Sequence, residues 1–230
     1  MTAENAFSKN YHYLDILVAF FVAVLLISNI ASTKILSLWK FTFDGGTILF
    51  PLSYIFGDIL TEVYGYKRSR RVIWLGFASA VLMSLVFYVV QLLPPAADWP
   101  HQEAFKSLLG FVPRIVLASL IAYFAGEFSN SFTLSKLKIF TSGRFLWLRT
   151  ISSTLIGQGL DTVIFCLIAF YGTLPGMVLV SVIISNYIFK CSVEILFTPL
   201  TYAIVNFLKK KENEDFYDVG VNYNPFRLSI

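Results

Sequence analysis

The sequence contains few of the residue types on which metal sites, disulfide frameworks and most catalytic sites depend. It has two cysteines and two histidines among 230 residues, and 14% of its residues are charged. Cys166 and Cys191 both lie in apolar stretches, where a thiol usually serves as a small core residue, so we expect no disulfide. The histidines are not paired and no CxxC motif occurs, and we therefore expect neither a metal ion nor another cofactor.

The short motifs of common catalytic sites are also missing. No HExxH, GxSxG or GxxxxGKS/T pattern occurs in the sequence. His12 and His101 lie outside the apolar stretches. We therefore predict that the chain is not an enzyme, a membrane-embedded one included, and that any ATP-driven step would need a separate ATPase subunit.

The sequence is instead rich in apolar residues. Hydrophobic residues make up 57% of it and 23 residues are phenylalanine, whereas soluble domains are roughly 45–50% apolar. The net charge of +4 does not indicate a nucleic-acid partner, because the basic residues gather at the ends of apolar stretches. This composition predicts an all-α membrane protein in contact with the lipid bilayer, a multi-pass bundle of helices.

Six membrane-spanning helices are predicted from the apolar stretches. Their approximate bounds are Leu14–Leu38, Gly46–Tyr64, Val72–Leu93, Val112–Leu134, Thr150–Tyr171 and Pro175–Leu208. The last is too long for one straight crossing, so it must tilt, extend beyond the bilayer or bend at Pro199. The expected organisation is a cytoplasmic N-terminal segment over 1–13, a transmembrane domain over 14–208, and a cytoplasmic tail over 209–230. The tail is polar, and we expect it to be flexible or lightly packed.

Basic residues also predict the orientation of the helices. Four follow the second span, at Lys67, Arg68, Arg70 and Arg71, and three lysines open the tail at Lys209. Because cytoplasmic loops carry the excess of Lys and Arg, both termini are expected in the cytoplasm and the loop Pro94–Pro113 outside. The first residues, MTAENAFSKN, are polar, so no cleavable signal peptide is expected.

Ionisable residues inside the predicted spans point to a polar interior. The acids are Asp58, Glu62, Glu127, Asp161 and Glu194, and the bases in or near the spans are Lys34, Arg114 and Lys190. A buried, unpaired charge costs several kcal/mol, so such groups are usually functional. Because the acids outnumber the bases, some carboxylates must carry protons or the site must receive a cation.

Helical spacing aligns these residues into stripes. Asp58 and Glu62 share a helix face within FPLSYIFGDILTEVYGYKRSRR, and Asn186, Lys190 and Glu194 recur every four residues. Polar stripes on four spans can enclose one site near mid-membrane, as in transporters. Structural alternatives stay open: Lys190 and Glu194 could form an ion pair, Gln158 and Asp161 could join helices, and Asp58 could pair with a base. Glu62, Glu127, Lys34 and Arg114 could likewise be structural or interfacial groups.

Several runs resemble one known family. FPLSYIFGDILTEVYGYKRSRRVIW, RIVLASLIAYFAGEF, WLRTISSTLIGQGLDTVIF and YIFKCSVEILFTPLTY are similar to the queuosine precursor transporters, also called the vitamin uptake transporters. The resemblance implies import of 7-deazaguanine queuosine precursors or queuine through a bacterial inner membrane. It implies substrate-binding roles for Asn29, Asp58, Arg114, Gln158, Asp161 and Lys190. Glu62, Glu127 and Glu194 match only some members and are candidates for substrate contact or proton coupling.

The chemistry of such a base fits these residue types. A guanine-like edge presents an N–H and an NH2 side by side, and one carboxylate, Asp58 or Asp161, can accept from both. The amides of Asn29 and Gln158 could read the carbonyl and ring nitrogens, and Lys190 could donate to the carbonyl. Aromatic side chains stack on planar bases. The candidates for stacking are Tyr54, Tyr123 and Phe165.

A substrate-capturing subunit of an energy-coupling-factor importer is the alternative interpretation. Such subunits are also small helical bundles, and they need a face of small residues for docking. Ala19 and Ala23 provide one AxxxA pattern in the first span, which is a weak signal. A homodimer is a further expectation for so small a bundle.

Overall fold

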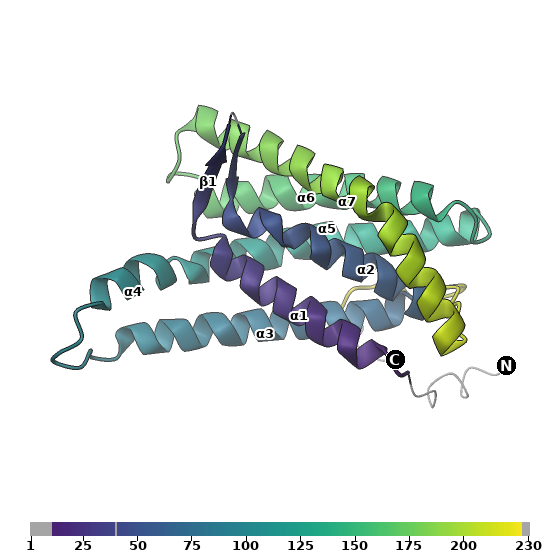
Figure 1. Ribbon diagram of the computed structural model, residues 1–230, viewed down its shortest axis with the longest axis horizontal. Helices are drawn as coiled ribbons and strands as arrows, with labels where there is room; N and C mark the ends of the chain where they lie inside the picture. The colour runs from purple at the N-terminus through teal and green to yellow at the C-terminus, as the bar shows by residue number, and fades with distance from the viewer. Residues whose placement is uncertain (1–10, 40, 227–230) are drawn as a thin grey trace.

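The computed structural model describes residues 11–39 and 41–226 of the chain. Its helices are α1 (Leu14–Ala31), α2 (Phe50–Tyr64), α3 (Tyr66–Leu92), α4 (Gln102–Leu109), α5 (Val112–Phe140), α6 (Leu146–Phe170) and α7 (Gly176–Glu212). The long helices run roughly side by side along the molecule, and β1 (Ile35–Leu38) and β2 (Phe41–Asp44) project near one end (Figure 1). The predicted N-terminal segment is described only from residue 11 onward.

Five of these helical segments are long and apolar enough to cross a membrane. They are α1, α3, α6, α7 and one segment that combines α4 with α5. Helix α2 has 15 residues, so at 1.5 Å per residue it is only about 22 Å long, less than the roughly 30 Å of a hydrocarbon core. It is nevertheless the most enclosed helix, since nearly all its side chains are buried by its neighbours. The predicted membrane bundle is therefore present, with α2 as its central element.

The helical membrane bundle is confirmed, but the expectation of a first span reaching Leu38 is wrong. Helix α1 ends at Ala31, and the chain then forms an antiparallel hairpin in which Ile35 pairs with Asp44. The hydroxyls of Ser32 and Thr33 favour the end of the helix here, because they donate hydrogen bonds to the carbonyls of its last turn. Asp44 then caps the 3-10 helix η2 (Gly45–Ile48) by accepting from two backbone N–H groups.

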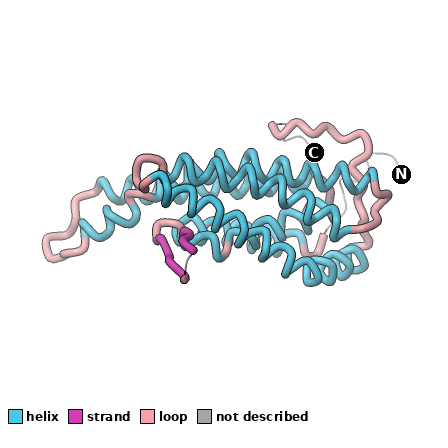
Figure 2. Tube along the Cα trace, turned by 90° about the horizontal axis from the view of Figure 1, so that it is seen from above, coloured by secondary structure: helices cyan, strands magenta, loops and turns pink. Residues whose placement is uncertain are grey.

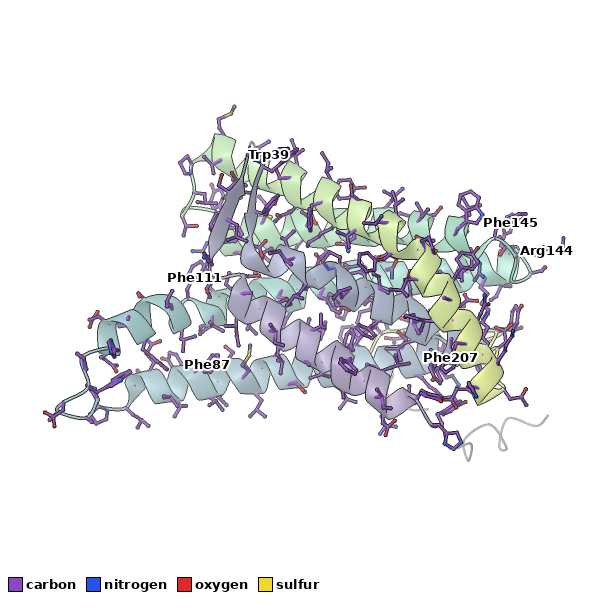
Figure 3. The ribbon with its side chains drawn as sticks, in the orientation of Figure 1. Trp39, Phe87, Phe111, Arg144, Phe145 and Phe207 are labelled. Atoms are coloured by element: carbon purple, nitrogen blue, oxygen red, sulfur yellow. The ribbon has the colours of Figure 1, made fainter. Side chains whose placement is uncertain are left out.

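The hairpin defines one end of the bundle, which we call the hairpin end. Trp39 lies at the tip of the hairpin, far from Arg144 and Phe145 in the loop between α5 and α6 (Figure 3). We call this opposite end the basic end, because Arg144 and the lysines at the close of α7 lie there. The loop Pro94–Pro113 belongs to the hairpin end and contains α4, a short helix that the sequence did not predict.

Helix α7 runs without interruption for 37 residues and contains Pro199. Its axis changes direction in its C-terminal part (Figure 1), as expected where a proline removes a backbone hydrogen bond. Tyr11 donates to Glu214 at 2.9 Å and the backbone N–H of Tyr13 donates to Glu212 at 2.8 Å. The start of the described chain therefore lies beside the C-terminal end of α7 at the basic end.

The segment after α7 is held to the bundle by hydrogen bonds. It folds back along the bundle (Figure 2), and Asp218 accepts from the backbone N–H of Tyr66 at 3.0 Å. Arg70 donates to the carbonyls of Asn222 and Asn224, and Trp74 donates to that of Pro225. Hydrogen bonds therefore hold the tail against α3 at these points, while most of residues 213–226 stay exposed or half-buried, in keeping with a lightly packed segment.

Candidate functional site

A small polar pocket lies between η2 and the helices beneath the hairpin. Its polar lining comes from Asn29 on α1, Asp44 and Thr47 beside η2, Ser119 on α5, Asp161 on α6 and Lys190 on α7. Three residues predicted for substrate binding, Asn29, Asp161 and Lys190, are thus brought together from three helices. They are separated by up to 161 positions along the chain, so only the folded bundle can assemble them.

Asp161 and Lys190 form the central ion pair of the pocket. Nζ of Lys190 lies 2.9 Å from Oδ2 of Asp161, and both side chains are buried. The ion pair predicted as an alternative between Lys190 and Glu194 is not formed: among the described residues, Lys190 pairs with Asp161. A buried pair of this kind must be kept intact, because loss of one partner leaves an uncompensated charge.

Two buried oxygens in the pocket are free to accept hydrogen bonds. Oδ1 of Asp161 and Oδ1 of Asn29 have no hydrogen-bond partner within the described part of the chain. The amide nitrogen of Asn29 is already committed, since it donates to the carbonyl of Leu25 at 2.7 Å. A buried acceptor without a donor is costly, so these two atoms can bind N–H groups of a ligand.

Close packing of α5 against α6 determines where Asp161 lies. A Cβ atom added to Gly126 would lie 2.7 Å from both the carbonyl oxygen of Gly157 and Cβ of Asp161. A Cβ added to Gly157 would lie 2.8 Å from the carbonyl oxygen of Gly126. Small residues allow two membrane helices to approach this closely. The two glycines therefore position the Asp161 side chain relative to α5.

Asp44 is a pocket residue that was not among the candidates predicted from the sequence. Its carboxylate accepts from Ser32 at 2.7 Å, from the Thr47 hydroxyl at 2.8 Å and from Nδ2 of Asn186 at 3.0 Å. Thr47 also donates to Oδ1 of Asn186 at 3.1 Å. Asp44 is thereby fully engaged in joining the hairpin to α1 and α7. An aspartate followed by Gly-Gly-Thr is a capping signal that could have indicated this role.

Aromatic rings flank the ion pair. Phe165, one of the predicted stacking residues, lines the pocket together with Phe50, which was not predicted. Nζ of Lys190 lies 4.5 Å from the centroid of the Phe50 ring, a cation–π contact. Tyr54 and Tyr123 lie behind Phe50 in the hydrophobic core, with their ring centroids 5.6 Å apart. Of the three predicted stacking residues, only Phe165 lines the pocket.

The pocket is narrow in this conformation. About 260 Å³ of space lies between its atoms, but this figure includes the part that is open to solvent. The free space at its centre is only large enough for about one water molecule. A planar base would therefore require the hairpin or the helices to move apart. A larger hollow between α3 and α5 is lined only by apolar side chains, including Trp74 and Phe226, and offers no polar partner.

Three other predicted substrate-binding residues lie outside the pocket lining. Arg114 donates to the carbonyls of Ile168 and Tyr171 at the C-terminal end of α6, where a cation is favourable. Oδ1 of Asp58 accepts from Nδ2 of Asn130 at 2.7 Å. Both polar atoms of the Gln158 side chain are buried without a hydrogen-bond partner among the residues described.

Glu62 belongs to a buried ionic cluster at the basic end. Arg149 contacts its carboxylate through two nitrogens, and Nζ of Lys209 lies 2.7 Å from its Oε1. Nζ of Lys138 lies 3.4 Å from the same oxygen and donates to the Glu62 carbonyl at 2.7 Å. Asp215 in the tail completes the cluster, at 2.7 Å from Lys138 and 2.9 Å from Lys209. The geometry of Glu62 is that of a group that joins α2, α5, α6 and α7.

Glu127 and Glu194 lie in the interior and form no ion pair with any base in the described part of the chain. Oε1 of Glu127 accepts from the Ser131 hydroxyl at 3.3 Å, and both oxygens of Glu194 lack a hydrogen-bond donor among the described residues. No group of three or more His, Cys, Asp or Glu side chains in residues 11–39 and 41–226 is arranged to hold a metal ion.

Known proteins resemble this chain over most of its length. The family described as "Putative vitamin uptake transporter" matches residues 44–204. The "Probable queuosine precursor transporter" of Bacillus subtilis (strain 168) is 32% identical over 186 residues, which are 80% of this chain and 81% of that protein. The "Queuosine precursor transporter" of Escherichia coli (strain K12) is 28% identical over 213 residues, 90% of this chain and 94% of that protein. No solved structure matches.

These comparisons confirm the resemblance inferred from the sequence motifs. The matching region contains α2, α3, α5, α6 and most of α7, and with them Asp161 and Lys190. The relatives are named as transporters and not as enzymes, which confirms the prediction that the chain is not an enzyme. Together with its apolar helices, they identify a multi-pass membrane protein. The chain belongs to the vitamin uptake transporter family, the family of the queuosine precursor transporters.

Proposed function

We propose that this protein imports a 7-deazaguanine base, a queuosine precursor or queuine, through the bacterial inner membrane. The basic end would face the cytoplasm, as the excess of Lys and Arg there favours. The names of the relatives support this class of substrate. The energy-coupling-factor alternative is not favoured, because the relatives that match most of this chain are named as transporters in their own right.

One observation carries the choice of site: the free buried Oδ1 of Asp161, held beside Lys190 in a polar pocket. A guanine-like edge carries an N–H and an NH2, and the free oxygens of Asp161 and Asn29 can accept from both. Lys190 can donate to the carbonyl of the base, and Phe165 or Phe50 can stack on its ring. The pocket thus supplies acceptors, a donor and an apolar face for one planar base.

Transport requires this pocket to open alternately to the two sides. In the present conformation it is too small for a base, and Asp44 at the end of β2 together with η2 forms its cover at the hairpin end. We propose that movement of this cover admits the base from outside, and that a later rearrangement at the basic end releases it. Asp58, Gln158 and Arg114 would then contribute outside the pocket as it is now formed. A homodimer is a further proposal, which crosslinking in native membranes would test.

The test is uptake in cells that cannot synthesise 7-deazaguanines. With this chain expressed, each base is fed at low concentration and queuosine in tRNA is measured. Asp161→Asn removes the charged acceptor, so uptake should fall by about tenfold to a hundredfold, the effect of a lost hydrogen bond to a charged group. Glu103→Gln changes an exposed carboxylate of α4 in the same way and should leave uptake unchanged. Wild-type uptake by the Asp161 variant would exclude this pocket as the site.

A further inference from the structure

A second polar cluster lies deeper in the bundle than the pocket. Asp58 is eight residues beyond Phe50 along α2, about 12 Å further toward the basic end by the helical rise. Glu194 follows Lys190 by one helical turn on α7 in the same direction. Glu127 of α5 packs directly against Gly57 of α2, where no room for a Cβ atom remains. The three carboxyls of this acidic cluster, Asp58, Glu127 and Glu194, therefore come from three helices.

The acidic cluster has too few donors and no base. Asp58, Glu127 and Glu194 are almost fully buried, and none of them forms an ion pair within residues 11–39 and 41–226. Oδ2 of Asp58 and both oxygens of Glu194 have no donor among the groups described. Three negative charges without a base cannot all remain in an apolar interior.

An amide marks this place as a ligand site independently of the carboxyls. The Asn130 side chain is fully buried and donates to Asp58, yet its Oδ1 has no hydrogen-bond partner in the described chain. Gln158, one turn from Asp161 toward the basic end, is equally buried, and neither of its polar atoms has a partner there. Unpaired amides of this kind indicate a site that binds a proton carrier, a water or a cation at another stage.

The arrangement of Asp58 and Glu194 favours a proton. The two carboxyls are close enough to influence each other, yet no hydrogen bond joins them in the described structure, since two ionised carboxylates offer no donor. When one of them is protonated, its O–H donates to the other, and both the missing donor and the excess charge are supplied at once. The three acids do not have the arrangement that a metal ion requires in the described residues.

Neighbouring charged and titratable groups determine the net charge around the acidic cluster. On α2 these are Glu62 and Tyr54, on α5 Tyr123, and on α6 Asp161 and Arg149. Asp161 is paired with Lys190, and Arg149 is engaged by Glu62. The only cations near the cluster are thus already neutralised by other carboxylates in the described structure, so Asp58, Glu127 and Glu194 need protons from solvent.

We propose that the acidic cluster is a proton-binding site that couples import of the base to the proton gradient. The proposal rests on the proposed function. A proton from the outside adds to a carboxylate oxygen of the cluster and forms a neutral carboxyl, which accompanies the closed, substrate-loaded state. On the inward-facing side the O–H bond breaks, the proton passes to water, and the carboxylate is restored.

The test uses the purified full chain in liposomes with a labelled 7-deazaguanine base. Counterflow exchange of the base, without any gradient, measures substrate recognition alone. Accumulation is then measured with the interior more alkaline than the exterior, with the membrane potential clamped, and with sodium either present or replaced. One proton per base allows accumulation to rise by up to about tenfold for each unit of pH difference.

Glu194→Gln should retain counterflow and lose the response to the pH gradient. Glu127→Gln gives a second variant of the same cluster, and Glu103→Gln on α4 is the exposed control that should keep both activities. Unchanged gradient response in both cluster variants would overturn the proposal. So would intact counterflow with accumulation driven by sodium or by neither ion. Absence of counterflow in the wild-type chain would instead overturn the proposed function, and the coupling with it.

Discussion

Lys190 and Asp161 meet at 2.9 Å between α7 and α6, and within residues 11–39 and 41–226 only one oxygen of the carboxylate has a hydrogen-bond partner. The pair therefore performs two tasks, since Oδ2 neutralises the lysine while Oδ1 remains available in the pocket. Substitutions can separate the contribution of this ion pair to folding stability from its contribution to substrate binding.

Lys190→Met should lower the free energy of unfolding by about 3–5 kcal/mol, because it leaves the Asp161 carboxylate buried and unpaired. Asp161→Asn in the same chain should recover part of this loss, since it removes the stranded charge. Thermal unfolding in detergent measures both effects. Glu194→Gln combined with Lys190→Met is the matched comparison. If stability were recovered by Glu194→Gln and not by Asp161→Asn, the observed pairing of Lys190 with Asp161 would be contradicted.

Gly126→Ala and Gly157→Ala should each destabilise the protein by about 1–3 kcal/mol, the usual effect of overpacking. Each added methyl would collide with the backbone of the facing helix and force α5 and α6 apart, and the one on Gly126 would also meet Cβ of Asp161, so uptake of the base should fall as well. Gly159→Ala, on α6 like Gly157, is the control. The Cβ added at Gly159 would lie at an ordinary contact distance of 3.6 Å from the nearest atom, in the Tyr187 ring. Equal behaviour of all three variants in thermal unfolding and uptake would refute close packing as the cause.

Gly65→Ala should release the tail from the basic end. Gly65 has a φ of +86°, which disfavours any residue with a Cβ, and an added Cβ would lie 2.3 Å from the Phe216 ring. We expect a loss of roughly 1–3 kcal/mol, together with faster proteolysis after residue 212. Phe216→Ala in the same chain should relieve the collision but not the backbone strain. Normal protease resistance of Gly65→Ala would show that the tail is held elsewhere.

Asp215 should make the tail sensitive to acid. Burial by itself would raise the pKa of Asp215, but hydrogen bonds from Lys138 and Lys209 outweigh it and lower that pKa below its usual value. A carboxyl whose pKa is lowered by folding stabilises the native state above its unfolded pKa of about 3.9. This contribution is lost as the pH falls through the lower, folded pKa.

The measurement compares thermal unfolding of the wild type and Asp215→Asn over a series of pH values. The difference should be constant near neutral pH and vanish in acid below about pH 4. It should stay under about 1 kcal/mol, because the Asp215 side chain is 45% exposed and its charge is screened by solvent. A difference that grows on acidification would have the wrong sign and would contradict the assigned pairing.

Much of the architecture follows from composition and spacing. The predicted spans after the first correspond to α2, α3, α5, α6 and α7 with shifted ends, because long apolar runs bounded by charges have few alternatives to helices in a bilayer. The hairpin was missed for a local reason. ILSL and FTFD are short apolar runs, and periodicity alone does not distinguish a strand from the end of a buried helix.

A polar interior, with Asp161, Lys190 and Asn29 as candidates for it, could be predicted from the sequence, because ionisable groups in apolar spans need partners or a function. Which of these groups meet depends on how the helices pack. The antiparallel register of α6 and α7 pairs Lys190 with Asp161 instead of Glu194, and the hairpin brings Asp44 into the pocket. These choices depend on contacts between segments far apart in the chain, which helical periodicity within one segment cannot specify.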